Sequence, residues 1–232
     1  MCGCGKPVPR AKRSSGSNQV AGEFLRYLIG LETPTKGEVD VVGRGVPDLT
    51  RGLPPFGVMF QQGALFGSRS VLENAALPLR EWTELGAESV DVIARSKLHL
   101  VGLEGAAGKL PAEISGGMTK RAAIARALAL DPGIVFLDEP QAGLDPVTAA
   151  GLDELIVTLA RASRITVVMV THELDSIFRI VDRCLLLDKK SKSVVAMGDP
   201  RELRSSGDPR VYEFFNPGSR RKEFSWPIPR TT

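Results

Sequence analysis

The chain has 232 residues, of which 43% are hydrophobic and 25% are charged, with a formal net charge of +3. This length fits one domain, or one domain with a sub-domain, and the small charge gives no argument for nucleic acid as a partner. Three cysteines exclude a disulfide framework and fit a reducing cytoplasm. No apolar run reaches the roughly 20 residues of a membrane span, so a role at a membrane would need spans from another chain.

The N-terminal part of the chain changes character abruptly. Residues 1–23 are rich in Gly, Ser, Pro, Lys and Arg without a hydrophobic period, so we expect them to be disordered. From Phe24, EFLRYLIGLE has the apolar face of a helix. GEVDVVG (37–43) alternates like a short strand, and FGVMFQQ (56–62) is a short apolar run of strand type.

A helical region follows. From residue 68 to 108 the pattern is helical, with breaks expected near Pro78 and Gly86. SGGMTKRAAIARALAL (115–130) predicts a strong helix with glycines at its start. We therefore expect a helical sub-domain over about 68–130.

The remainder alternates strands with helices. GIVFLDEP (133–140) predicts a buried strand. The residues after it predict, in order, a helix over about 147–163, the strand RITVVMVTH, a helix over about 173–181, and the strands RCLLLD and SVVAMG. Such alternation favours an α/β fold with a mostly parallel sheet covered by helices. Residues 216–232 read as an extended tail.

Two adjacent acids end the most apolar predicted strand. Asp138 and Glu139 follow Ile134–Leu137, at the strand end where open α/β sheets bind ligands. The first acid can hold Mg²⁺ and its waters, and the second can polarise an attacking water. A charged exit from the strand explains this segment alone equally well.

Other polar residues strengthen the functional interpretation. Ser115-Gly116-Gly117 precedes a helix, where bare N–H groups suit phosphate oxygens, although a plain N-cap is the simpler explanation. His172 ends the next predicted strand and can reach a phosphate, unless it is an ordinary loop histidine. Asp145 lies in AGLDP, seven residues after Asp138. The other histidine, His99, receives no role.

As a set, these motifs resemble those of the nucleotide-binding domain of ABC transporters. FQQGALF is similar to the Q-loop, ISGGM to the signature, IVFLDEP to Walker B, AGLDP to the D-loop and VTH to the switch histidine, in the family's order. The resemblance covers about 24–215, and implies a P-loop NTPase-like fold with a mostly parallel sheet and a helical sub-domain. It divides the chain into an aberrant N-terminus (1–23), an ATPase domain (24–215) and a tail (216–232).

The resemblance implies roles for four residues in ATP hydrolysis. Asp138 would hold Mg²⁺ through water, and Glu139 would be the general base or position the water. Gln61 would sense the metal and the water and couple them to a transmembrane partner. His172 would contact the γ-phosphate. These are the usual parts of phosphoryl transfer: positioning, metal and charge stabilisation.

Four further residues imply a dimer. Ser115, Gly116 and Gly117 would grip the γ-phosphate of ATP bound to a second nucleotide-binding subunit, and Asp145 would connect the two sites. Composite sites of this kind imply a two-fold homodimer.

A finer resemblance points to lipid transport. FQQGALFGSRSVLENAALPLR and GDPRELRSSGDPRVYEFFNP are similar to the ATPase subunits of ABC systems that work with MCE (mammalian cell entry) lipid-binding proteins. Met118, where most ABC proteins carry Gln, fits this group. The resemblance implies a place on the cytoplasmic face of the inner membrane, permease subunits as direct partners and the MCE protein as an indirect one.

The phosphate loop is the part that does not match. It needs G-x-x-x-x-G-K-[ST] between a strand and a helix, but in GCGKP, Pro7 stands at the hydroxyl position and no strand precedes it. Counting back from Leu25 in the family pattern, the lysine position holds Ala21 and the hydroxyl position Gly22. The family's first strands are expected upstream of Met1. A frameshift or misplaced start explains the abrupt change, and a degenerate paralogue is the alternative.

Three functions remain open. The first is an ATPase subunit of a lipid-transporting ABC complex, impaired by loss of the phosphate loop. The second is a non-catalytic pseudo-ATPase that docks on a permease or partner subunit. The third, an ABC-type ATPase acting on DNA or ribosomes, needs a coiled-coil insert or a second nucleotide domain, and the sequence has neither.

Overall fold

A parallel three-stranded sheet forms the centre of the computed structural model, which describes residues 18–41, 56–188 and 190–218. Its strand order is β1-β2-β3, so segments far apart in the sequence pair in the sheet. The three strands are β1 (Phe56–Met59), β2 (Ile134–Asp138) and β3 (Thr166–Val170). All three were predicted from their short apolar runs, and the expected parallel sheet is confirmed.

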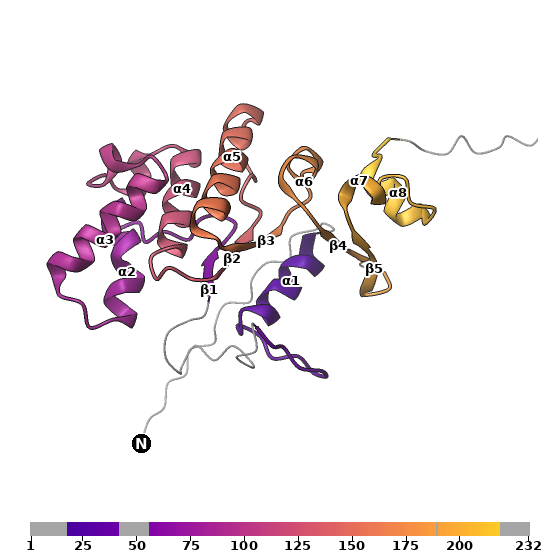
Figure 1. Ribbon diagram of the computed structural model, residues 1–232, viewed down its shortest axis with the longest axis horizontal. Helices are drawn as coiled ribbons and strands as arrows, with labels where there is room; N and C mark the ends of the chain where they lie inside the picture. The colour runs from indigo at the N-terminus through magenta and orange to yellow at the C-terminus, as the bar shows by residue number, and fades with distance from the viewer. Residues whose placement is uncertain (1–17, 42–55, 189, 219–232) are drawn as a thin grey trace, which may run out of the picture.

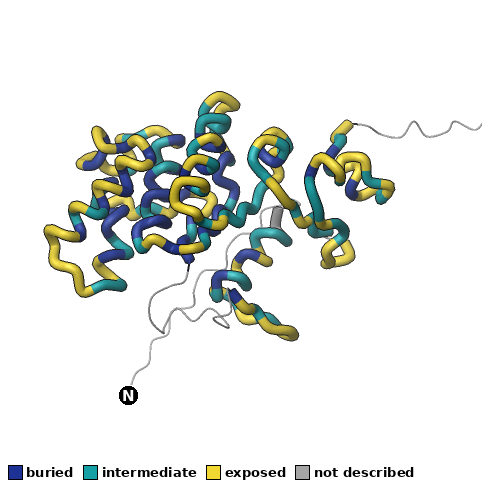
Figure 2. The backbone as a smooth tube through the Cα atoms, viewed as in Figure 1, coloured by how far each residue is buried: buried dark blue, intermediate teal, exposed yellow. Residues whose placement is uncertain are grey.

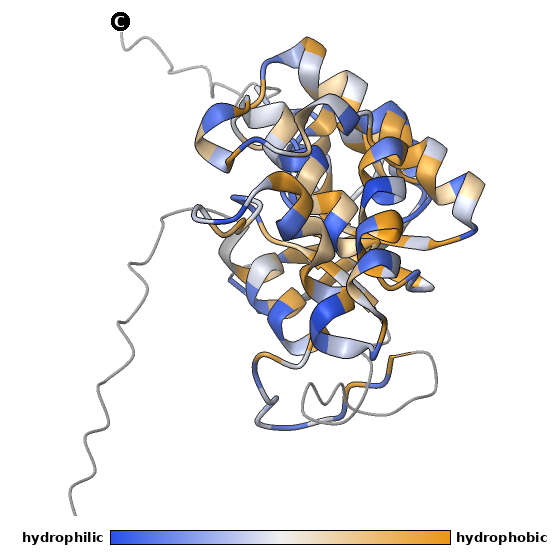
Figure 3. Cartoon of the chain, turned by 90° about the vertical axis from the view of Figure 1, so that its left-hand side faces the viewer, coloured by the Kyte–Doolittle hydropathy of each residue, from blue (hydrophilic) through white to orange (hydrophobic). Residues whose placement is uncertain are grey.

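Helices cover both faces of this sheet (Figure 1). They are α4 (Gly116–Ala127) and α5 (Pro146–Ser163) on one face, and α1 (Asn18–Leu28) on the other. The alternation along β2 produces this arrangement, since Val135 and Leu137 belong to the cluster that includes α4 and α5, while Phe136 packs beside Leu25 of α1. Most helices in Figure 3 carry both hydrophobic and hydrophilic stretches, as covering helices should.

The helical sub-domain consists mainly of α2 (Val71–Trp82) and α3 (Ala87–Leu100), with 3₁₀ turns at Glu104–Ala106 and Pro111–Glu113. A capping box starts α2: the Ser70 hydroxyl accepts from the Glu73 N–H, and the Glu73 carboxylate accepts from the Ser70 N–H. The break expected at Pro78 was wrong, because α2 continues through it to Trp82. The cap and the buried apolar side chains of α2 hold the helix despite the proline.

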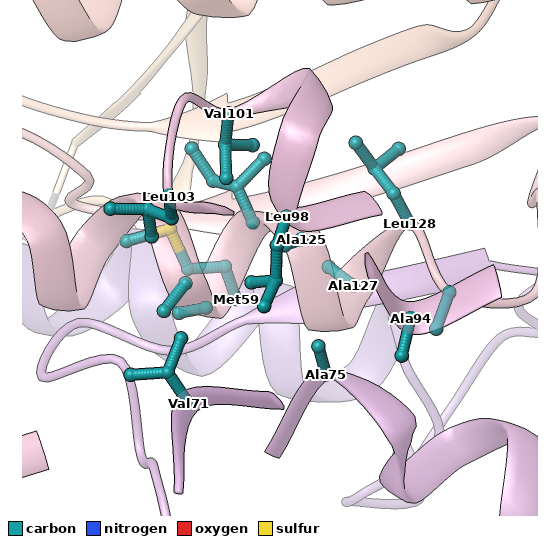
Figure 4. Packing of buried hydrophobic residues seen from close by; sticks show 14 of the residues in the cluster. Met59, Val71, Ala75, Ala94, Leu98, Val101, Leu103, Ala125, Ala127 and Leu128 are labelled. Atoms are coloured by element: carbon teal, nitrogen blue, oxygen red, sulfur yellow. The ribbon is translucent and has the colours of Figure 1, made fainter. Parts of the chain in front are cut away.

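The largest hydrophobic core joins the sub-domain to the sheet. Alanines on α4 let α2 and α3 approach closely, and apolar side chains from β1, α2, α3 and α4 interleave around them (Figure 4). Met59, Val71 and Ala75 are completely buried there, as are Leu98 and Ala125.

A second, antiparallel sheet lies toward the C-terminus. It pairs β4 (Cys184–Asp188) with β5 (Ser193–Gly198), and it is flanked by α6 (Leu174–Ile180), α7 (Pro200–Leu203) and α8 (Pro209–Phe215). Ile177, Val211 and Phe215 form its buried cluster, but in Figure 2 this part is mostly intermediate or exposed. None of the described helices has the length and apolarity that crossing a membrane requires.

Two expectations near the N-terminus need correction. Residues 18–23, which we expected to be disordered, belong to α1, because no proline interrupts them and Val20 and Ala21 are partly buried. The strand predicted over 37–43 does not form in residues 37–41; instead Val41 is buried beside α1 and β2. Residues 1–17, 42–43 and 219–232 lie outside the described residues, so those parts of the predictions stay open.

Candidate functional site

The two acids lie at the carboxyl end of β2. Glu139 is only 6% exposed, and its backbone takes a left-handed conformation with φ of 44°. Its N–H donates to the carbonyl oxygen of Val170 at 2.8 Å, which fixes the turn after β2 against the end of β3. A non-glycine residue in this conformation is uncommon and is often associated with a functional site.

Gln61 and His172 both reach the Glu139 carboxylate. The amide nitrogen of Gln61 donates to Oε2 of Glu139 at 2.5 Å, and Nδ1 of His172 lies 3.3 Å from Oε1. Gln61 follows β1 and His172 follows β3, so the carboxyl ends of three neighbouring parallel strands bring these side chains together. The structure therefore brings Gln61, Glu139 and His172 together at one edge of the sheet.

Asp138 lies beside this group in an environment that resists its ionisation. Burial raises the pKa of Asp138 above its ordinary value, and the neighbouring Glu139 carboxylate adds to the rise. Lys120 and the backbone amide of Gln61 oppose it. A bound cation would favour the charged form of this pair, because it would offset the repulsion between the two carboxylates.

Few protein ligands are available for such a cation. No cluster of three or more His, Cys, Asp or Glu side chains within residues 18–41, 56–188 and 190–218 could hold a metal ion. Asp138 and the Gln61 amide oxygen can supply one or two ligands. That number suits Mg²⁺, which keeps several waters and bridges to phosphate, better than a cation that needs a complete protein cage.

Ser115 and Asp145 are both helix N-caps. The Ser115 hydroxyl accepts from the Met118 N–H at 3.3 Å at the start of α4. The Asp145 carboxylate accepts from the Val147 and Thr148 N–H groups and from the Thr148 hydroxyl at the start of α5. These hydrogen bonds, those of Thr148 above all, lower the pKa of Asp145. Within this chain, helix capping accounts for the presence of both residues. A second role for either of them would require contact with another subunit.

Gly117 brings the two N-termini together. A Cβ on Gly117 would lie 2.7 Å from Cγ2 of Thr148, whereas a Cβ on Gly116 would be 3.8 Å from its nearest neighbour, Leu144. Gly117 is therefore needed for the packing of α4 against α5, and Gly116 is not. Gly116 is also exposed, so its backbone is accessible to a ligand.

We expect Gly117→Ala to destabilise the protein by about 1–3 kcal/mol, because the added methyl group forces Thr148 and the start of α5 to move. Gly116→Ala is the matched control, and it should be neutral or slightly stabilising, since alanine favours a helix. Urea unfolding followed by circular dichroism measures both. Equal stabilities of the two variants would contradict this account of Gly117.

The positions that match the phosphate loop carry no donor side chain. Ala21 and Gly22 lie inside α1, and neither offers an ammonium or hydroxyl group to a phosphate. A Cβ on Gly22 would meet nothing within 4 Å, so Gly22 is not required by packing.

Three buried charged residues were missed by sequence reasoning, and one of them, Lys97 of α3, pairs with Asp131. Lys120 of α4 is 5% exposed and contacts the backbone carbonyls of Gln61 and Glu139. Asp153 of α5 is completely buried. The only available signal was a charged residue within a helix, which ordinarily indicates an exposed face.

Comparisons with known proteins give the family. The family model described as "ABC transporter" matches residues 23–142, about half of the chain. The chain is 42% identical over 199 residues to the "Probable ribonucleotide transport ATP-binding protein mkl" of Mycobacterium leprae, a match covering 83% of this chain and 56% of the relative. It is 39% identical over 218 residues to the "Intermembrane phospholipid transport system ATP-binding protein MlaF" of Escherichia coli K12, covering 90% and 80%.

A solved structure agrees with this assignment. A dimeric ATP-binding cassette in a post-hydrolysis state, bound to ADP and Pi, superposes with a TM-score of 0.67 at 30% identity, covering 77% of this chain and 80% of that one. The chain spans little more than half the length of the mycobacterial relative. From the extent of these matches, together with the fold, the chain belongs to the ABC transporter family.

Proposed function

We propose that this chain is the ATP-binding subunit of an ABC-type system that moves phospholipids or other lipids across a bacterial envelope. The observation that carries the proposal is the convergence of Gln61 and His172 on Glu139 at the carboxyl edge of the sheet. The similarity to a phospholipid-transport ATP-binding protein supports the lipid as cargo.

The residues at the sheet edge fit Mg²⁺ and an attacking water. Asp138 would hold Mg²⁺ through water, with the Gln61 amide oxygen nearby, and the ion would supply positive charge to phosphate oxygens. Glu139 is held by Gln61 on one carboxylate oxygen and lies near His172 on the other, so it is oriented to accept a proton from water. His172 is half-exposed at the same edge and would contact a phosphate oxygen.

The residues of α1 do not fit the triphosphate. A cradle there needs an ammonium and a hydroxyl group, and Ala21 and Gly22 provide neither. Loss of about three charge-assisted hydrogen bonds, each worth roughly 1.5–3 kcal/mol, would weaken ATP binding by about a thousandfold or more. α1 therefore supplies no group to a hydrolysis step.

The proposed partners follow from the other half of the site. Ser115, Gly116 and Gly117 would contact ATP held by a second copy of the chain, and Asp145 would connect the two sites. The dimeric structure of a similar cassette supports a homodimer. Permease subunits would carry the membrane spans, with an MCE-type lipid-binding protein beyond them, and the chain would lie on the cytoplasmic face of the inner membrane.

One observation favours a second candidate function, a non-catalytic subunit. The absence of donor side chains at Ala21 and Gly22 would disable the chain's own site, while the signature residues Ser115 to Gly117 could still complete a site on a partner. Nucleotide binding by a mixed dimer with an intact cassette, but not by this chain alone, would support this candidate.

The decisive variant is Glu139→Gln, which keeps the shape and the hydrogen-bonding capacity of residue 139 but removes its basicity. Because Ala21 and Gly22 supply no phosphate-binding side chain, wild-type phosphate release at millimolar Mg-ATP should be low. We expect Glu139→Gln to reduce that residual rate by about 100-fold or more, in line with the loss of a general base. Glu173→Gln is the control, because Glu173 is an exposed carboxylate beside the same histidine and should leave the rate within twofold of wild type. A wild-type rate equal to that of Glu139→Gln would argue against the ATPase and for the non-catalytic subunit.

A further inference from the structure

A buried lysine lies at the centre of the site without a role in the chemistry described above. Lys120 lies on α4, five residues after the cap Ser115, and is 5% exposed. Burial lowers the pKa of Lys120, and the carboxylates of Glu139 and Asp138 oppose the shift. An isolated buried ammonium group is costly, so the surroundings of Lys120 must compensate its charge.

The contacts of Lys120 join three segments. Its ammonium group donates to the backbone carbonyl of Gln61 and, at 3.3 Å, to the backbone carbonyl of Glu139. The same Glu139 carbonyl accepts from the Ala142 N–H at 3.1 Å. One side chain therefore ties α4 both to the loop after β1 and to the turn after β2.

Lys120 is hydrogen-bonded to the backbone of Gln61 and Glu139, the two residues whose side chains are hydrogen-bonded to each other. Gln61 donates to the Glu139 carboxylate at 2.5 Å, a distance that requires both backbones to stay in place. Glu139 also holds a left-handed conformation, which persists only when surrounding contacts stabilise it. Lys120 supplies such a contact on the carbonyl side, and Val170 supplies one on the N–H side.

We propose that Lys120 is a positioning residue that couples the signature helix α4 to the Gln61 loop and to Glu139. The start of α4 carries Ser115 to Gly117, which face the partner's nucleotide in the proposed function, and this inference rests on that function. Lys120 lies about one and a half turns along α4 from Ser115. A displacement of α4 caused by the partner's nucleotide is transmitted through Lys120 to Glu139, which follows β2. The contacts of Lys120 described above are with the backbone of Gln61 and Glu139.

The first test measures backbone protection and needs no activity. Lys120→Met removes the ammonium group and keeps an apolar side chain of similar length. We expect amide hydrogen exchange in segments 60–67 and 139–145 to accelerate by roughly five- to tenfold, since one or two hydrogen bonds of about 1 kcal/mol each are lost there. Lys97→Met is the matched control, because Lys97 is also buried in a helix and pairs with Asp131, which precedes the opposite end of β2 from segment 139–145. Unchanged exchange, or a uniform increase across all segments, would overturn the proposal.

The second test separates positioning from binding. In steady-state hydrolysis we expect Lys120→Met to lower kcat by about tenfold with KM within twofold of wild type, because the nucleotide contacts are untouched. A change confined to KM would overturn the positioning role. If the wild-type chain hydrolyses no ATP, the ATPase proposal fails, while the exchange experiment still decides the role of Lys120. Should Lys120→Met not fold, Lys120→Gln gives the same two measurements.

Discussion

Gly57→Ala is expected to destabilise the fold strongly. Gly57 is the second residue of β1, where the strand lies directly against the end of α4. A Cβ at this position would lie 1.9 Å from the carbonyl oxygen of Ala127 and 2.7 Å from its carbonyl carbon. Both are backbone atoms, so no side-chain rotation relieves the overlap, and β1 and α4 would have to separate.

The free energy of unfolding is expected to fall by about 3 kcal/mol or more. This is at or above the upper end of the usual cost of overpacking a core, because separating β1 from α4 also disturbs the largest hydrophobic core. That loss is a large fraction of the roughly 5–15 kcal/mol that stabilises a typical domain. Urea unfolding followed by circular dichroism is the measurement. Gly67→Ala is the control, since a Cβ on Gly67 would meet nothing within 4 Å. If Gly57→Ala unfolds within 1 kcal/mol of wild type, α4 is not held against β1 as described.

The central sheet could be predicted because its strands are apolar, with β1 and β2 largely buried and β3 partly buried. Phe56–Met59, Ile134–Leu137 and Thr166–Val170 are short apolar runs separated by helical segments, and that pattern is typical of parallel strands. GEVDVVG has the alternation of a strand but does not form one within residues 37–41. Local alternation specifies a strand only when a neighbouring strand is available to pair with it.

Part of the candidate site could also be predicted. Gln61, Glu139 and His172 each follow a strand, and parallel strands place such residues at the same edge. Lys120 could not be predicted, because its partner Gln61 lies 59 residues away in the sequence and a lysine on a helix ordinarily indicates an exposed face. Charged residues that are buried by tertiary contacts have no local signal.

Asp153→Ala is the second change with a large expected effect. Asp153 lies on α5 with no solvent exposure, and three side chains donate to it. They are Gln141 at 2.6 Å, Ser176 at 2.8 Å and Arg179 at 2.9 Å. Asp153 thus connects the segment after Glu139 to α6, the helix that follows His172.

Removing this carboxylate should destabilise the fold by about 3–5 kcal/mol. The buried Ser176 hydroxyl would lose its acceptor, and the Gln141 amide would keep only the Met169 sulfur at 3.5 Å. Arg179 is 42% exposed and can turn to water, so it contributes less to the loss. Asp91→Ala provides the control: its i,i+4 pair with Arg95 is exposed, and breaking that pair should cost less than about 0.5 kcal/mol. Urea unfolding of both variants gives the comparison. Because Asp153 bridges two elements that flank the site, its loss should also accelerate amide hydrogen exchange in segment 139–145. A loss of less than 1 kcal/mol in the free energy of unfolding would contradict this account, and would show that water replaces the carboxylate.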